Sequence, residues 1–254
     1  MSPDAATFVA IFIIFSAVVI VLSRISKGRK QEKEEELRKS VMLRGWTFDS
    51  KLDKGYRVYR FSGTTDGVTW EAESLRLVAG GNRRDARRHI ARWHGKWSPG
   101  VNAPIVGMGV PKGKEVLGTN IAAGDGFFAR MAQKAAGLMF DKAIDVYFGK
   151  EIGDQIDAEE LRRVENVSVP GFILMAKDVN EGSRILNEGL QRALVDATND
   201  KNNALADEDR PWVLVRAQGV SLARMEQFRD AGELEQFIKA GVGLTKAFRF
   251  GRRA

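Results

Sequence analysis

An uncharged apolar run stands at the N-terminal end of the chain, before any alternating pattern begins. Residues 5–22 read AATFVAIFIIFSAVVIVL and contain no charged side chain. A helix that rises about 1.5 Å per residue would span roughly 27 Å over this run, close to the thickness of the hydrocarbon core of a bilayer. The pattern predicts a transmembrane helix over residues 5–23, after a short extracytoplasmic tail at residues 1–4.

A cleaved signal peptide and a buried core helix are the two alternatives for this run. A signal peptide has basic residues before its apolar part, whereas Ser2, Pro3 and Asp4 stand there. It also has a small-x-small cleavage site, but the sequence after the run is basic. A core helix is rarely apolar on all sides at a chain terminus. We therefore predict a retained anchor, in contact with membrane lipids.

Basic side chains directly follow the run and predict its orientation. The positive-inside rule places Lys/Arg-rich flanks on the cytoplasmic side of a membrane. We therefore expect a single-pass protein of the bacterial inner membrane, with its N-terminus outside and the residues after 23 in the cytoplasm. The membrane-flank residues are Arg24, Lys27, Arg29 and Lys30.

The next segment, residues 24–42, is dominated by charged side chains that favour a helix. Glu34 and Arg38, like Glu35 and Lys39, stand four residues apart with the acid first, which supports a solvated helix. A coiled-coil dimerisation segment is the alternative, but Leu37 is the only large aliphatic residue between residues 27 and 40. The pattern predicts a charged helical stalk.

Alternation with a period of two predicts antiparallel hairpins in the remainder of the chain. Residues 56–62 and 68–77 flank a loop that contains Asp66-Gly67, and residues 212–217 and 220–224 flank Gln218-Gly219. In residues 68–77, Val68, Trp70, Ala72 and Ser74 are predicted to share a core face, and Thr69, Glu71 and Glu73 a solvated one. Opposite Arg57 and Arg60, the two glutamates are typical of cross-strand charge pairing rather than of catalysis.

Apolar positions at helical spacing predict helices over residues 127–148, 178–195 and 233–248, and short apolar runs predict strands at 103–110 and 171–177. Asp178 is the expected N-cap of the second helix. Strands precede helices in blocks, which is typical of an α+β class. We therefore predict antiparallel β-hairpins packed with amphipathic helices in one cytoplasmic domain, residues 43–254, with two subdomains at 43–126 and 127–254 as the alternative division.

Composition excludes several kinds of site. The 254 residues include no cysteine and two histidines, so thiolate catalysis, disulfides and sulfur-bound zinc are excluded. His89 and His94 are five residues apart, which points their side chains in different directions on a helix and to opposite faces on a strand. The glycine-rich residues 107–115 match neither phosphate-loop nor dinucleotide patterns. We expect no cofactor, no metal and no catalytic residue.

A basic cluster with two tryptophans lies within residues 82–97. The sequence leaves open whether this segment is a helix, with its tryptophans on one stripe, or a strand, with basic residues alternating with tryptophans. It predicts a surface for a partner or for lipid, made of Arg83, Arg84, Arg87, Arg88, Arg92, Trp93, Lys96 and Trp97.

Four explanations of this cluster compete. It is a solvated basic face packed through its tryptophans, a contact for anionic lipid, a contact for an acidic partner protein, or a nucleic-acid surface with stacking tryptophans. The leading hypothesis is a membrane-anchored accessory protein, not an enzyme, that binds a membrane or cytoplasmic partner protein or the anionic membrane surface. A membrane-anchored nucleic-acid binder and an enzyme without a recognisable motif are the alternatives. A deep pocket with a buried, unpaired carboxylate would favour the enzyme.

Overall fold

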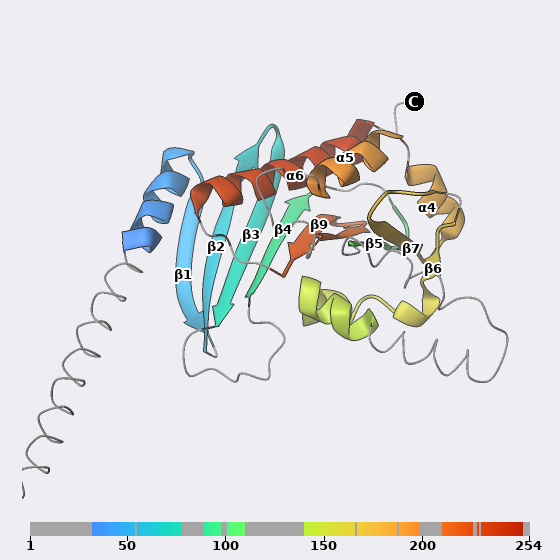
Figure 1. Ribbon diagram of the computed structural model, residues 1–254, viewed down its shortest axis with the longest axis horizontal. Coiled ribbons are helices and arrows are strands. Elements are labelled where there is room, and N and C mark those ends of the chain that lie inside the picture. The colour runs from blue at the N-terminus through green and yellow to red at the C-terminus, as the bar shows by residue number, and fades with distance from the viewer. Residues whose placement is uncertain are drawn as a thin grey trace, which may run out of the picture. The chain divides into compact units, whose positions relative to one another are not determined.

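The computed structural model describes ten segments of the chain: residues 32–53, 55–77, 89–97, 101–109, 140–165, 167–186, 188–198, 210–225, 228 and 230–250. The chain divides into two compact units, Met1–Gly45 and Trp46–Ala254. Figure 1 shows the elements of both units.

The described part of the first unit is one helix, residues 32–43. It ends in a turn at Gly45, whose φ of +72° suits a residue without a Cβ atom. The guanidinium of Arg44 donates hydrogen bonds to the carbonyl and hydroxyl oxygens of Ser40, at 2.8 and 2.7 Å. The described residues of the predicted stalk are therefore helical.

The second unit is built on a nine-stranded antiparallel sheet with the order β1-β2-β3-β4-β9-β8-β5-β7-β6. The strands β1 to β4 are neighbours in the sequence and also in the sheet. Because β4 pairs with β9, strands from before and after residue 126 belong to the same sheet. The strands are β1 (Thr47–Asp53), β2 (Tyr56–Thr65), β3 (Val68–Leu77), β4 (His89–Lys96), β5 (Ile105–Gly109), β6 (Arg162–Arg163), β7 (Phe172–Ala176), β8 (Trp212–Arg216) and β9 (Gly219–Arg224).

The predicted hairpins are confirmed. Strands β2 and β3 pair along their whole length, and a two-residue turn at Asp66 and Gly67 joins them, with φ of +51° and +77°. Positive φ at both turn residues matches the twist of antiparallel strands. The predicted alternation along β3 is also confirmed, because Val68, Trp70, Ala72 and Ser74 are all buried.

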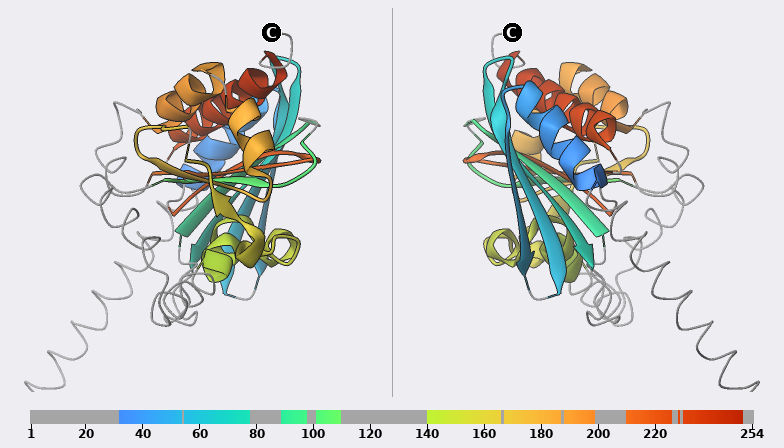
Figure 2. Two further views of the ribbon diagram at one scale, coloured as in Figure 1. Left: turned by 90° about the vertical axis from the view of Figure 1, so that its right-hand side faces the viewer. Right: turned by 90° about the vertical axis from the view of Figure 1, so that its left-hand side faces the viewer.

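One face of the sheet is covered by helices α4 (Val179–Ile185), α5 (Glu188–Thr198) and α6 (Ala231–Phe250). Figure 2 shows α5 and α6 together on the same side of the sheet. The ring of Trp93 in β4 packs on Gly241 of α6, where a Cβ atom would overlap it. The helix predicted over residues 233–248 is confirmed as part of α6, and the apolar positions that predicted it are buried: Leu234, Phe237, Ile238, Val242 and Phe248.

Among the described residues, the opposite face is covered only in part. Helical residues 140–148 and α3 (Lys150–Gly153) lie against β9, β8 and β5, and the 3₁₀ helix η1 (Ala158–Glu160) follows. Their apolar core contains Val106, Ile144, Phe148, Ile156, Leu161, Leu214 and Ala223. Next to this core, the same face of β1 to β4 carries polar side chains.

The predicted fold class needs correction. Among the described residues, no helix is long and apolar enough to cross a membrane, and the predicted span at residues 5–23 lies outside them. Even α6, the longest described element, interleaves its apolar stripe with Glu233, Glu235 and Lys239, because it packs one side on a sheet. The structure supports a mixed α/β fold with a large antiparallel sheet, and the transmembrane, single-pass part of the prediction is not supported.

The structure also changes the bounds of several predicted helices and strands. The predicted helix over residues 178–195 is two helices, α4 and α5, although Asp178 caps α4 as expected by accepting from the backbone N–H groups of Asn180 and Glu181. Of the predicted helix at 127–148, only residues 140–148 are described, and they are helical. The undecided segment 82–97 is a strand from His89 to Lys96.

Candidate binding hollow on the sheet face

Half of the predicted partner surface lies outside the described residues. Arg83, Arg84, Arg87 and Arg88 belong to residues 78–88, and the membrane-flank residues Arg24, Lys27, Arg29 and Lys30 belong to residues 1–31. The remaining members, which are Arg92, Trp93, Lys96 and Trp97, lie in or directly after β4.

Strand β4 separates these remaining members. Trp93 points toward α6 and is 1% exposed, so its ring is not available to a partner at the surface. Arg92 and Lys96 point to the opposite face, where both are engaged with glutamates of β3, and Trp97 is half-buried. Because successive residues of a strand face opposite sides, the tryptophan and the basic groups cannot form one patch.

A hollow of 530 Å³ opens on the polar face of β1 to β4. Phe148 and Ile152, from the segment that covers the neighbouring part of this face, form its apolar wall. Two rows of cross-strand neighbours form its polar floor: Thr47, Ser62, Glu71, His94 and Ser221 in one row, and Asp49, Arg60, Glu73 and Arg92 in the other.

Arg92 fastens the apolar wall to the polar floor. Its Nη1 donates to Glu73 Oε1 at 2.6 Å, its Nε donates to the carbonyl of Tyr147 at 2.7 Å, and its Nη2 donates to the carbonyl of Val146 at 2.8 Å. The two carbonyls are at the C-terminal end of helical residues 140–148, where a cation is favoured by the helix dipole. Arg92 is therefore a structural residue of the hollow.

The outer part of the floor keeps unengaged charges. Asp49 and Arg60 are cross-strand neighbours, both are exposed, and among the described residues neither side chain makes a hydrogen bond or an ion pair. The hydroxyls of Thr47 and Ser62 are 2.5 Å apart, and Lys96 holds Glu71 in an exposed ion pair. A bound molecule therefore meets a free acid and a free base at this lip.

The inner part of the floor holds a neutral imidazole. His94 Nδ1 is 3.0 Å from the hydroxyl oxygen of Ser221, which is 3% exposed. Burial is the largest cause that lowers the pKa of His94 below its usual 6.5, and the charges of Arg216 and Lys96 lower it further, while Glu71 raises it.

This environment predicts a pH effect on folding. Because the pKa of His94 is lower in the folded state, the stability gained from neutral His94 is present above pH 6.5 and is lost as the pH falls through the folded pKa. We expect His94 to titrate below 6.5 in an NMR titration of the imidazole resonances, and H94Q to lose this part of the acid sensitivity in urea unfolding. A His94 midpoint at or above 6.5 would contradict the described burial.

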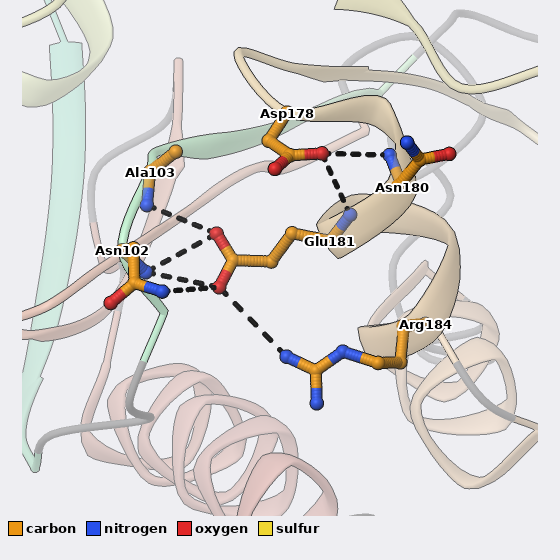
Figure 3. A network of polar contacts seen from close by, with 6 residues as sticks. All are labelled: Asn102, Ala103, Asp178, Asn180, Glu181 and Arg184. Atoms are coloured by element: carbon orange, nitrogen blue, oxygen red, sulfur yellow. Dashed lines mark hydrogen bonds and ion pairs between the residues drawn. The ribbon is translucent and has the colours of Figure 1, made fainter.

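The one buried carboxylate among the described residues is structural. Glu181 of α4 is 8% exposed and accepts hydrogen bonds from the backbone N–H groups of Asn102 and Ala103, at 3.1 to 3.2 Å, and from the side-chain amide of Asn102 at 3.4 Å (Figure 3). Arg184 approaches it at 3.9 Å. This carboxylate fixes the segment that leads into β5 and does not meet the condition for an unpaired catalytic acid.

Replacing Glu181 with glutamine tests that role. In E181Q an NH2 group would replace one of the two accepting oxygens, so a buried donor of Asn102 or Ala103 would face another donor and lose its acceptor. We expect a loss of about 1–3 kcal/mol in the free energy of unfolding, measured by urea denaturation. R184Q, which removes only a long and exposed ion pair, should lose less than about 0.5 kcal/mol. Equal losses for the two variants would contradict the assignment.

Comparison with protein-family models, with curated proteins and with solved structures gives no match for this chain.

Some residues that line the hollow can be predicted from local sequence patterns, but the way in which they come together cannot. The solvated face of β3 was predicted from alternation, and the matching alternation of Arg92, His94 and Lys96 in β4 is a second sign of a polar sheet face. Asp49, Ser221 and Phe148 carry no such local sign. They join the hollow through strand pairing and packing between segments far apart in the sequence.

Proposed function

We propose that this protein is an interaction protein that holds a segment of a partner protein in the hollow. The observation that supports this proposal is the combination of an apolar wall, Phe148 and Ile152, with the side-chain charges of Asp49 and Arg60, which have no partner among the described residues. The volume of 530 Å³ lies within the range of about 300–1,000 Å³ that is usual for ligand sites.

The geometry favours recognition of a particular partner. Free charges of both signs at the lip attract a segment with complementary charges and repel a segment with the opposite pattern. The floor belongs to paired strands, which hold side chains more precisely than loops do. The apolar wall supplies buried area, and the charges supply selectivity.

Binding explains the described residues better than the two alternatives. For catalysis, Glu73 is neutralised by Arg92, and Ser221 is too buried to attack a substrate. For nucleic acid, the burial of Trp93 removes one of the two predicted stacking rings, and three of the hollow's side chains are acidic: Asp49, Glu71 and Glu73.

Site-specific photocrosslinking tests the proposal in cells that make the full chain. A photoreactive side chain at Ser62 would lie on the floor of the hollow, and one at Lys239, which is 68% exposed on α6, is the matched control. We expect a discrete protein adduct from position 62 that is missing from position 239. The same adducts from both positions, or none from position 62, would contradict the proposal.

A further inference from the structure

The two edges of the nine-stranded sheet differ greatly in length. One edge is β6, which has two residues, and the other is β1, which has seven residues, contains no proline and pairs with β2 in an unbroken register. Among the described residues, β1 has β2 as its only strand neighbour. A long and regular edge strand is a template for a further strand, whereas a very short one is not.

The register shows which backbone groups of β1 face outward. The two-residue turn between β2 and β3 makes Thr65 and Val68 a hydrogen-bonded pair, and such pairs alternate with non-hydrogen-bonded pairs along antiparallel strands. The even-numbered residues of β2 therefore bond to β1, where they pair with odd-numbered residues. The N–H and C=O groups of Phe48, Ser50 and Leu52 consequently point away from the sheet.

The side chains of β1 are accessible on both faces of the sheet. Asp49 and Lys51 are exposed on the polar face, and neither side chain has a hydrogen bond or an ion pair among the described residues. On the other face, Leu52 is 65% exposed, and Phe48 is half-buried with its ring stacked on Tyr59 at 5.9 Å. The edge therefore presents charged and apolar side chains beside its outward backbone groups.

The order of these side chains is self-complementary about Ser50. A second β1 can lie antiparallel to the first with the two Ser50 residues opposite one another. In this register Asp49 faces Lys51 of the other copy, in a non-hydrogen-bonded pair, where side chains lie closest. Phe48 faces Leu52 in the same way, and the two-fold axis repeats both contacts. Opposite charges and apolar pairs stabilise facing strands.

Charge disfavours the neighbouring registers of the same two strands. The outward backbone groups can bond one another only in registers that differ by two residues. A shift of this size in one direction places Asp49 opposite Asp49 of the second copy, and a shift in the other direction places Lys51 opposite Lys51. Like charges directly opposite one another are destabilising. The sequence of β1 therefore favours one register and acts against its neighbours.

We propose that β1 binds β1 of a second copy of this chain about a two-fold axis at Ser50, so that two sheets join into one. Lys51 thereby gains the ion pair that it lacks among the described residues of one copy. Asp49 also lines the hollow, and because a carboxylate accepts at two oxygens, an ion pair across the edge leaves an oxygen for the lip. The dimer does not rest on the proposed function, since its contacts are complete without a partner segment.

Disulfide crosslinking tests the dimer in cells that make the full chain, because the chain has no cysteine of its own. The Cα atoms of a directly opposite, hydrogen-bonded pair are about 5.5 Å apart, which suits a disulfide. We therefore expect S50C to give a disulfide-linked dimer after treatment with copper phenanthroline. L52C is the matched control, because Leu52 faces Phe48 and lies about 13 Å along the strand from its own copy, too far for a disulfide.

Exchange of charges identifies the contact responsible. In the S50C background, K51D sets two aspartates opposite one another and should lower the yield of the disulfide-linked dimer about tenfold. D49K/K51D brings opposite charges together again in exchanged positions and should restore the yield. No disulfide from S50C, equal yields from S50C and L52C, an unchanged yield in K51D, or a yield in D49K/K51D as low as in K51D would each overturn the dimer.

This test is separate from photocrosslinking at Ser62. Lys51 does not line the hollow, so K51D removes the dimer without altering a side chain that a partner segment would meet there. The photocrosslinked adduct from position 62 should therefore persist in K51D while the disulfide from S50C is lost. Failure of the dimer and failure of the proposed function are distinguished in this way.

Discussion

The variant W93A should lose about 3–5 kcal/mol in the free energy of unfolding. The indole of Trp93 is 1% exposed and packs on Gly241 of α6, so its removal leaves a cavity between the helix and the sheet. That cavity cannot close easily, because β4 pairs with β3 on one side and with β9 on the other. Urea denaturation of the full chain, followed by far-UV circular dichroism, measures the loss.

The control for W93A is W97A. Trp97 follows β4 directly and is half-buried, so its removal should cost clearly less than the removal of Trp93. If W93A lost less than about 1 kcal/mol, Trp93 could not be a core residue, and a surface role would again be open.

The variant R92M should lose about 2–4 kcal/mol. Methionine keeps an apolar stem of similar length but removes three hydrogen bonds, which leaves Glu73 without its partner and frees the carbonyls of Val146 and Tyr147. Hydrogen exchange should also become faster in residues 140–148, because Arg92 holds the end of that helix on the sheet. Urea denaturation and exchange mass spectrometry measure the two effects.

Two comparisons show whether Arg92 acts through this geometry. R92K should restore only part of the stability, because a lysine cannot donate in three fixed directions at once. A double-mutant cycle with E73Q should show coupling between the two positions. R184M removes an exposed arginine with one long ion pair and should lose less than about 0.5 kcal/mol. If R92M lost as little as R184M, Arg92 would not fasten the wall of the hollow.

Local patterns in the sequence predict much of this fold. The Asp66-Gly67 turn, the buried face of β3, the cap at Asp178 and the apolar stripe of α6 each depend on residues that are near one another in the chain. Periodicity expresses these local relations directly.

The arrangement of the strands is not local, and the sequence did not predict it. The sequence of residues 82–97 suits a helix through the stripe of its tryptophans and a strand through its alternation, and pairing with β3 and β9 makes residues 89–96 a strand. The same pairing separates Arg92 from Trp93, which the sequence had grouped in one surface. Hydropathy of residues 5–22 predicted a span for which the described helices give no support, since their apolar residues form stripes that pack on the sheet.

The central claim is that a partner segment binds in the hollow, and one measurement tests it most directly. The double variant D49R/R60D exchanges the two free charges, so the strands keep an acid opposite a base while the pattern at the lip is reversed. We expect the yield of the photocrosslinked adduct from position 62 to fall about tenfold in this folded variant, equivalent to about 1.4 kcal/mol of binding free energy, and to stay unchanged in K239E. An unchanged yield in D49R/R60D would contradict the claim.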